Sequence, residues 1–324
     1  MKTKPTRAQS IAMLAFLLAS GVALASAPLQ RTQAPGYYRL MLGDFEVTAL
    51  SDGTLPFNVG ALLKHVTPAQ LDADLARVFL KEPVETSVNA FLVNTGARLV
   101  LIDTGIGPSG PPSAGRLLAN LRAAGYRPEE VDDILITHMH GDHIGGLSRN
   151  GQAVFPNATV HAARAEAEYW LSEARMNAAP AARRGAFRGA MAALKPYVDA
   201  MRFETFDGDV DVVPGIRAVA APGHTPGHTM YLVSSRGEQL LLWGDLVHVA
   251  AVQFLDPSVT ISFDSDSAQA ARERLKIFAM VAAKGYLIGG AHLSFPGLGH
   301  LRANRGAGYT FVPVSYTLPR TASH

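Results

Sequence analysis

Apolar residues recur along this chain in short runs separated by glycine, proline and polar residues. Alternating or continuous apolar runs predict strands at 38–42, 45–50, 89–94, 99–102, 134–137, 159–161, 216–220, 230–234, 239–243 and 287–288. Helical spacing predicts helices over 113–124 and from the end of the strand at 159–161 through Glu173. It also predicts a helix over 181–200, interrupted at Pro196, and one over 267–283 with Ser267 as N-cap. Residues 174–190 are rich in Ala, Arg and Gly with little periodicity, and we expect them to be mobile.

The order of these elements is informative about the fold class. Strand pairs come first, then helices, and then strand pairs followed by another helix. This order argues against a purely parallel, doubly wound sheet. It favours an α/β fold in which two β-sheets face each other and helices cover both outer sides.

The first 25 residues have the pattern of a secretion signal. Three basic residues precede the apolar run Ile11–Leu18, which is short for a membrane span. Ala23-Leu24-Ala25 fits a small-x-small cleavage site, and we expect cleavage after Ala25. We therefore predict a signal peptide over 1–25, a single catalytic domain over 26–324 and an exported, periplasmic or secreted protein. An uncleaved anchor is the alternative.

Cleavage changes what the net charge implies. The signal carries three basic and no acidic residues, so the formal charge falls from +2 to −1 when it is removed. The pI of 8.8 is then no indication of a nucleic-acid partner. The chain has no cysteine, so any metal must be held by His, Asp or Glu.

The densest chemical signal is the run from Thr137 to His143. His138, His140, Asp142 and His143 follow a predicted buried strand and lie among glycines. Alternate residues of an extended segment point to one side, so His138 and His140 can converge. Neutral imidazoles and carboxylates are ligands for zinc and similar ions. The run therefore indicates a metal site.

Three further strand ends offer side chains of the same kind. His224 and His228 follow the strand over 216–220, Asp245 ends the strand over 239–243, and His292 follows the strand at 287–288. Each lies beside glycine, where the backbone can approach a ligand closely. Brought to one edge, these groups would complete a site for two metals.

Together these motifs resemble the metallo-β-lactamase superfamily, whose hallmark is H-x-H-x-D-H followed by a later His, an Asp and a last His. Within it the chain is similar to methyl parathion hydrolase and its lactonase and arylesterase relatives, through Ala34–Tyr38, Glu85–Leu92 and Gly289–Gly297. The resemblance spans roughly residues 34–314. It implies a four-layer αβ/βα sandwich with two facing mixed sheets, and it implies a homodimer.

The resemblance also implies a distribution of ligands and supporting residues. It places His138, His140 and His224 on one divalent ion, Asp142, His143 and His292 on the other, and Asp245 between them. Asp103 would support the ligands, and His228 would stabilise its loop rather than bind metal. Zinc is the first expectation, with manganese, cobalt and iron as alternatives.

A hydroxide bridging two cations is a nucleophile near neutral pH, because metal binding lowers the pKa of water. Asp245 would orient this hydroxide, and Asp142 could pass a proton to the leaving group. His248 stands where quorum-quenching lactonases of this superfamily have a tyrosine. It could donate a hydrogen bond or a proton, or it could simply line the substrate pocket.

Trp170, Phe187 and Phe263 are candidates for an aromatic pocket wall, together with His248. They favour small, neutral aromatic substrates. We therefore predict hydrolysis of lactones and aryl esters such as dihydrocoumarin, with phosphotriesters such as methyl parathion and methyl paraoxon as side substrates. A dedicated organophosphate hydrolase is the alternative. A mononuclear-iron oxidoreductase of the sulfur dioxygenase type is a more distant one.

Overall fold

The computed structural model describes residue 27 and residues 29–317. The predicted signal peptide over 1–25 therefore lies outside the described residues. From Pro35 onward the described chain forms one compact unit, and it contains every candidate site residue.

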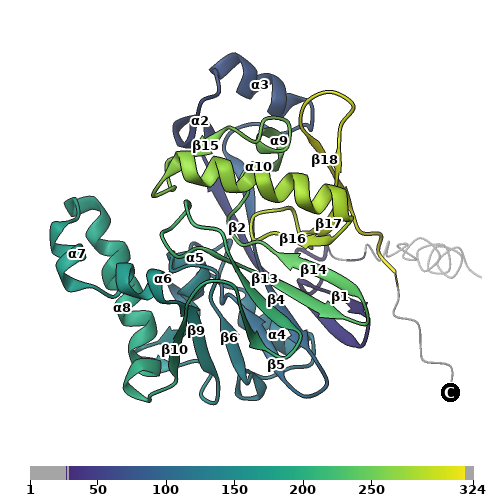
Figure 1. Cartoon of the computed structure of the whole chain (residues 1–324). Coiled ribbons are helices and arrows are strands. Elements are labelled where there is room, and N and C mark those ends of the chain that lie inside the picture. Colours follow the sequence, from purple (N-terminus) through teal and green to yellow (C-terminus); the bar gives the residue numbers. More distant parts are fainter. Residues whose placement is uncertain (1–26, 28, 318–324) are drawn as a thin grey trace, which may run out of the picture. The chain divides into compact units, whose positions relative to one another are not determined.

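The first of two large sheets has seven strands, with an antiparallel half and a parallel half (Figure 1). Its order is β1 (Tyr37–Leu42), β2 (Phe45–Phe57), β4 (Val84–Asn94), β5 (Leu99–Ile102), β6 (Asp133–Leu135), β9 (Thr159–Ala163) and β10 (Phe203–Phe206). The pairs from β1 to β5 are antiparallel, and those from β5 to β10 are parallel. The sheet is therefore mixed.

The second sheet also has seven strands. Its order is β11 (Val210–Val213), β12 (Ile216–Ala220), β13 (Thr229–Ser235), β14 (Glu238–Leu242), β16 (Leu287–Gly289), β17 (Leu298–Ala303) and β18 (Tyr309–Pro313). Only β14 and β16 are parallel neighbours, so they end at the same edge. Two small ribbons pair β3 (Leu63–Lys64) with β15 (Thr260–Ile261) and β7 (Ser148–Arg149) with β8 (Gln152–Ala153).

The helices differ greatly in length. They are α2 (Val59–Leu62), α3 (Pro68–Ala76), α4 (Leu117–Ala123), α5 (Gly141–Ile144), α6 (Arg164–Trp170), α7 (Glu173–Ala178), α8 (Arg184–Asp199), α9 (Ala250–Gln253) and α10 (Ser267–Lys284). Three short 3₁₀ turns lie at Gly107–Ser109, Pro128–Glu130 and Ala181–Arg183.

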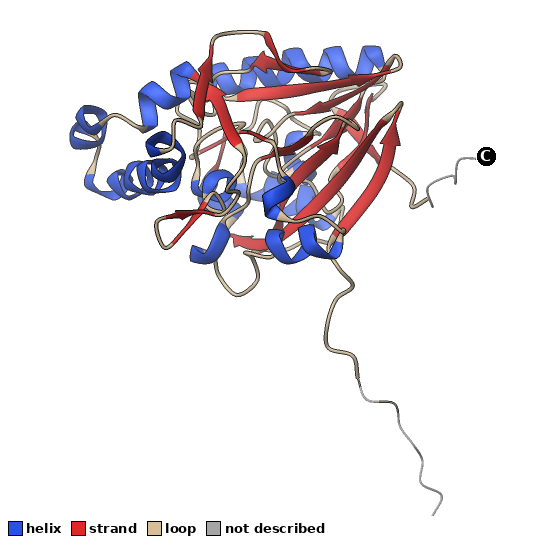
Figure 2. Ribbon diagram, turned by 90° about the horizontal axis from the view of Figure 1, so that it is seen from below, coloured by secondary structure: helices blue, strands red, loops and turns tan. Residues whose placement is uncertain are grey.

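Three buried clusters define four layers (Figure 2). The central cluster lies between the sheets and joins residues such as Val47 and Val93 to Ala218 and Val233. A second cluster packs the outer face of the first sheet against α4, α6 and α8, and a third packs the second sheet against α10. The predicted sandwich of two facing mixed sheets with outer helices is confirmed.

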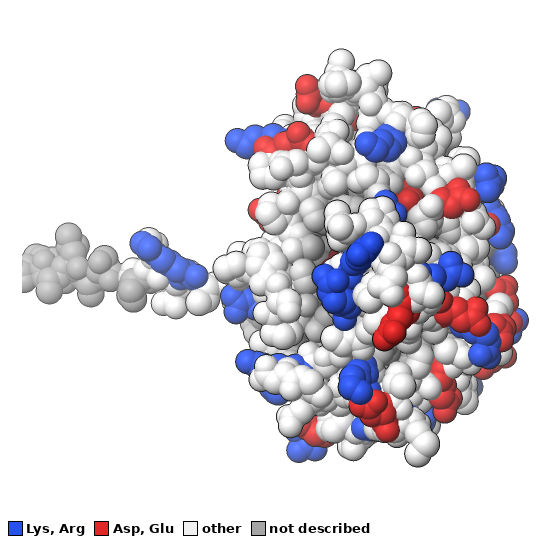
Figure 3. All heavy atoms as spheres, turned by 90° about the vertical axis from the view of Figure 1, so that its left-hand side faces the viewer, with Lys and Arg blue, Asp and Glu red and all other residues white. Residues whose placement is uncertain are grey.

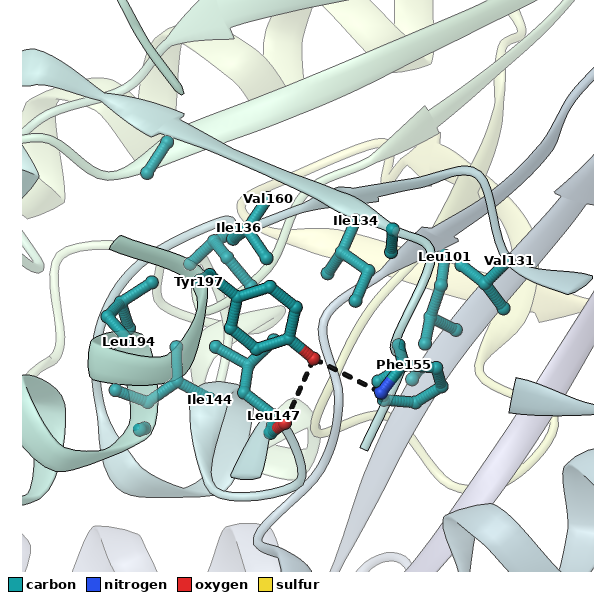
Figure 4. Packing of buried hydrophobic residues seen from close by; sticks show 14 of the residues in the cluster. Leu101, Val131, Ile134, Ile136, Ile144, Leu147, Phe155, Val160, Leu194 and Tyr197 are labelled. Atoms are coloured by element: carbon teal, nitrogen blue, oxygen red, sulfur yellow. Dashed lines mark hydrogen bonds between the residues drawn. The ribbon is translucent and has the colours of Figure 1, made fainter. Parts of the chain in front are cut away.

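Tyr197 shows how a polar group is accommodated in the outer cluster of the first sheet (Figure 4). Its hydroxyl donates to the Leu147 carbonyl at 3.0 Å and accepts from the Phe155 N–H at 3.2 Å. Both loop segments are thereby fixed against α8, since a buried hydroxyl must be paired to be tolerated. Burial raises the pKa of Tyr197 to about 12, so the phenol keeps its proton.

The region over 174–190, expected to be mobile, is instead largely helical. It contains α7, a 3₁₀ turn and the start of α8. The prediction was wrong because the apolar positions Phe187, Ala190 and Leu194 repeat at helical spacing and pack into the core. Pro196 does not interrupt α8, which continues to Asp199. The Ala192 carbonyl, which proline leaves without its helical partner, accepts from the Ser148 hydroxyl at 3.4 Å.

Two helix starts also differ from the expectation. The helix predicted from residue 113 begins at Leu117, because Gly115 has a left-handed φ of 75° and the Asp52 carboxylate accepts from the Leu117 N–H. The cap of α10 is Asp266 rather than Ser267, and its side chain accepts from the Gln269 N–H. A carboxylate at the N-cap pairs a backbone donor that the helix leaves free.

Two further observations concern the surface. Among residues 29–317, the structure has no helix of the length and apolar character that crossing a membrane needs. On the face that carries α7 and α8, Lys and Arg are interspersed with Asp and Glu (Figure 3).

Candidate metal centre

Four loops bring the candidate ligands to one edge of the two sheets. His138 to His143 follow β6 and run into α5, and His224 lies in the loop between β12 and β13. Asp245 follows β14 and His292 follows β16, which is the parallel neighbour of β14. Both halves of the fold therefore contribute side chains to the cluster.

Three histidine rings converge on one point. His138 Nε2 lies 3.1 Å from His140 Nδ1 and 3.2 Å from His224 Nε2, and His224 Nε2 lies 3.0 Å from His140 Nδ1. Zinc–nitrogen bonds of 2.0–2.1 Å in a tetrahedron separate the nitrogens by roughly 3.3 Å. The three nitrogens therefore match a single cation closely.

The second group lies on the other side of Asp245. The carboxylate of Asp142 lies 3.7 Å from His143 Nε2 and 3.4 Å from His292 Nε2. The other nitrogens of these rings are occupied, His143 Nδ1 by Asp103 and His292 Nδ1 by the Ser87 carbonyl. Each ring is thereby oriented with Nε2 toward the cluster.

Asp245 lies between the two groups. Its Oδ1 is 3.1 Å from His143 Nε2, and its Oδ2 is 3.2 Å from His292 Nε2 and 3.3 Å from His224 Nε2. Asp245 Oδ1 and His143 Nε2 are buried and have no hydrogen-bond partner among the described residues. Such atoms are costly unless a cation binds them. The donors therefore fit two divalent cations.

The three rings of the first group differ in protonation. In His224 burial lowers the pKa, but Asp245 and Asp264 outweigh it and raise the pKa to about 9. In the other two rings burial dominates. It lowers the pKa of His138 and His140 well below the usual range, and neighbouring histidines lower it further. Both rings are therefore neutral, as a metal ligand must be.

Around Asp245, opposite charges outweigh burial in setting the pKa values. Burial lowers the pKa of His143, but Asp245, Asp142 and Asp103 outweigh it and hold that pKa well above the usual value. Burial raises the pKa of Asp245, yet His143 and the other histidines outweigh it and hold the carboxyl ionised.

Asp103 occupies the supporting position that the resemblance implies. Its carboxylate accepts from the Thr137 N–H at 2.8 Å and the Thr137 hydroxyl at 2.7 Å, and it holds His143 Nδ1 at 2.8 Å. Asp103 has a left-handed φ of 60°, which a non-glycine residue adopts at an energetic cost. The three contacts offset that cost and hold both ends of the segment from Thr137 to His143.

His228 also supports the cluster without facing it. Its Nδ1 contacts the Ala221 carbonyl at 3.2 Å, and its Nε2 accepts from the Asp245 N–H at 3.1 Å. Burial lowers the pKa of His228 to about 3, which keeps Nε2 free to accept. At Gly244 a Cβ would lie 2.8 Å from this nitrogen, so glycine is needed for the close approach.

Asp264 supports the cluster although no metal motif of the sequence includes it. Its Oδ1 lies 2.9 Å from His224 Nδ1, so it orients this ring as Asp103 orients His143. It follows the short strand β15, outside any metal motif, and only its proximity to Phe263 drew attention to this segment.

A cavity of about 430 Å³ opens over the cluster. Trp170, Phe187 and Phe263, which the sequence predicted for the substrate pocket, all line it. Further lining residues that the sequence analysis did not name are Leu55, Phe57, Ile106, Tyr169, Arg183, Ala186, Ser262 and Ser265. His140, Asp142, Asp245 and His292 form the floor. The cavity therefore joins apolar walls to the metal ligands.

His248 is not one of the residues that line this cavity. Its Nε2 lies 3.1 Å from Asp245 Oδ2, and its ring is stacked on His292 and near Phe263. Burial lowers the pKa of His248 to about 4, so the ring is neutral and can offer Asp245 one N–H.

Comparison with known proteins agrees with this geometry. The model of the metallo-beta-lactamase superfamily matches residues 83–289, and the chain belongs to that superfamily. The class of protein that its fold, site and relatives define is a metal-dependent hydrolase.

Two curated relatives are N-acyl homoserine lactonases. The one from a Bacillus species is 26% identical over 61% of this chain and 79% of its own length. The one from Bacillus cereus is 28% identical over 51% of this chain, and the match spans 58% of its own length.

Two solved structures cover nearly the whole described fold. The hydrolase AbOPH of the beta-lactamase superfamily is 38% identical, with a TM-score of 0.84 over 88% of this chain and 100% of its own. AidC, a dizinc quorum-quenching lactonase, is 28% identical, with a TM-score of 0.81 over 87% of this chain and 99% of its own. A dizinc relative supports the presence of two divalent metals here.

Proposed function

We propose that this protein hydrolyses lactones and aryl esters with the help of two divalent metal ions, zinc first among them. The observation that carries the proposal is a cluster of seven His and Asp ligands at the floor of an aromatic-walled cavity. The lactonases among the relatives support the same substrate class.

Divalent cations held by these seven residues would supply Lewis acidity, which lowers the pKa of water enough to make a nucleophile near neutral pH and polarises a substrate carbonyl. Asp142 is the acidic side chain best suited to carry a proton. It lines the cavity and its side chain is 19% exposed, so it can reach the leaving oxygen of a substrate. The backbone N–H of Asp245 donates to His228, and its carboxylate faces both ligand groups. Asp245 can therefore orient the nucleophile.

The aromatic walls bind and orient the apolar part of the substrate. Trp170 and Phe187 are in tilted contact, with ring centroids 4.8 Å apart, and form a rigid wall beside His140. Phe263 packs edge-on against Phe57, with ring centroids 5.8 Å apart. Phe263 lies on the opposite, more exposed wall of the cavity. A flat aromatic lactone or ester fits between such surfaces.

We assign His248 to Asp245 rather than to the cavity wall. Its Nε2 lies 3.1 Å from Asp245 Oδ2, on the carboxylate that faces both ligand groups. His248 would then influence the rate of the chemical step more than substrate affinity.

Kinetics of metal-loaded protein with measured zinc content tests the proposal. The substrates are dihydrocoumarin, phenyl acetate, N-hexanoyl-homoserine lactone and methyl paraoxon. We expect higher kcat/KM for the lactones and the aryl ester than for methyl paraoxon, with slow phosphotriester hydrolysis as a side activity. Much faster cleavage of methyl paraoxon would favour a dedicated organophosphate hydrolase. If the protein binds one iron and consumes oxygen with a thiol substrate, an oxidoreductase function would be supported in place of hydrolysis.

A further inference from the structure

Glu166, on the helix α6, is a completely buried carboxylate that the proposed chemistry does not use. Both of its oxygens are engaged. Oε1 accepts from the Met139 N–H at 2.8 Å, and Oε2 accepts from the Gly227 N–H at 2.9 Å. These charge-assisted bonds are stronger than bonds between neutral groups.

The two anchored backbone groups belong to different halves of the fold. Met139 lies between His138 and His140, after a strand of the first sheet, while Gly227 lies in the His224 loop between two strands of the second sheet. One side chain thus ties together the two loops that carry the three converging histidines.

The other ligand group is held by different contacts. His143 is fixed by Asp103, and His292 is fixed by the Ser87 carbonyl. Neither hydrogen bond of Glu166 in the described chain is made to His143 itself or to the loop of His292. Its effect should therefore fall on one metal site and not on both.

The arrangement is costly, which argues for a specific role. No Lys, Arg or His of the described chain forms an ion pair with Glu166, and a buried charge without a cation costs folding free energy. The helix also approaches the loop very closely, since a Cβ on Gly227 would lie 2.3 Å from the Glu166 nitrogen. An apolar residue could fill the space but could not accept two N–H donors.

The same helix ends at Trp170, whose ring contacts the His140 ring with centroids 5.4 Å apart. Trp170 also lines the cavity. The anchor at Glu166 therefore fixes a wall of the cavity and three metal ligands as one unit.

We propose that Glu166 is a positioning residue that sets the relative placement of His138, His140 and His224 and thereby the affinity of one metal site selectively. It touches neither metal nor substrate. A purely structural role would instead lower overall stability and weaken both sites alike.

Zinc affinity of single-site variants tests this. His292→Ala leaves the group of His138, His140 and His224, and His224→Ala leaves the group of Asp142 and His143 with His292. Zinc dissociation constants are measured for both variants by competition with a chelating dye, with and without Glu166→Gln. Visible spectra of the cobalt(II)-substituted proteins report the ligand geometry of each site.

We expect Glu166→Gln to weaken zinc binding by about 10–100-fold in the His292→Ala background, with a changed cobalt spectrum, and to leave the His224→Ala background unchanged. Glu168→Gln, on the exposed side of the same helix, is the matched control and should change neither. Equal weakening in both backgrounds, or none in either, would overturn the proposal.

Circular dichroism establishes that each variant is folded. If Glu166→Gln does not fold, Glu166→Asp, which keeps a carboxylate with a shorter reach, is measured in the same backgrounds. Selective weakening in the His292→Ala background supports the proposal, and any other pattern contradicts it. The measurement involves no substrate, so an error in the proposed activity and an error in this role of Glu166 are distinguishable.

Discussion

His224 and Asp264 form a buried pair in which Nδ1 of the ring lies 2.9 Å from Oδ1 of the carboxylate. The pair fixes the tautomer that presents Nε2 to the metal site, and it makes the ring a better electron donor. Asp264 Oδ2 also accepts from the Ile261 N–H at 3.2 Å, so the carboxylate is itself held in place.

Asp264→Asn should therefore weaken the binding of one of the two zinc ions by about 10–100-fold. Zinc content after dialysis against buffered free zinc measures the effect. Asp199→Asn, at an exposed ion pair with Lys195, is the control and should retain both ions. An Asp264→Asn protein that retains both ions under the same dialysis would show that the pair does not tune the site.

Phe263 and Phe187 should respond differently to truncation. Phe263 is 37% exposed, so Phe263→Ala opens no sealed void, and the loss of roughly 1.5 kcal/mol of apolar contact raises KM for phenyl acetate about tenfold. Phe187 is buried, so Phe187→Ala should also destabilise the fold by about 3–5 kcal/mol. Steady-state kinetics and urea unfolding separate the two effects. An unchanged KM for Phe263→Ala would remove this residue from the substrate site.

Asp52 should make stability depend on pH. Burial raises its pKa above 3.8, although the N–H groups of Ile106 and Leu117 act against this. The folded state therefore holds the proton more tightly than the unfolded state, so the contribution is present at low pH and is lost as pH rises through the folded pKa. The stability advantage of the wild type over Asp52→Asn, from urea unfolding at each pH, should narrow from pH 4 upward. Widening over that range would mean that the pKa is depressed.

Arg274 should be essential for the loop that follows Asp245. Its buried guanidinium donates to the carbonyls of Leu246, Pro257 and Val259 at 2.6–2.9 Å. Arg274→Met leaves the carbonyls of Leu246 and Pro257 without this donor, while Val259 keeps the Gln253 side chain, and the change should cost about 3 kcal/mol or more. Arg272→Met, two residues earlier on the exposed side of α10, should be nearly neutral in the same unfolding experiment.

The signal peptide remains a prediction with a simple test. Expression of the full chain in a bacterium with an outer membrane should give a mature protein in the periplasm or medium that begins at Ser26, as measured by intact mass. Ala23→Asp and Ala25→Asp should retain the precursor. Light scattering of the mature protein tests the expected homodimer. A full-length chain recovered from the cytoplasm would contradict export.

The metal ligands were predictable because their signal is local. His138 to His143 form one contiguous run, and His224, Asp245 and His292 each follow an apolar strand beside a glycine. Asp264 and Glu166 carry no such signal, because their importance arises from contacts with residues 40 and 27 positions away. In the sequence Glu166 looks like an ordinary charge on a helix.

Most strands of the fold were predictable, but three of the four end strands of the sheets, and the inner strand β17, were not. A central strand such as β5 is a short run of four buried apolar residues, so its sequence identifies it. The strands β10, β11 and β18 lie at the ends of their sheets, where partial exposure allows polar residues to break the apolar pattern. The helix α3 was missed for the same reason, since most of its residues face solvent.

Because both sheets contribute metal ligands, bound metal would join the two halves of the fold. The chain has no cysteine, so no disulfide can tie one half to the other. Bound ions would act as a reversible cross-link between segments far apart in sequence, closing a long loop in the folded state only. A chelator would then behave as a mild denaturant, and the supply of metal would govern how long the folded protein survives as well as how fast it works.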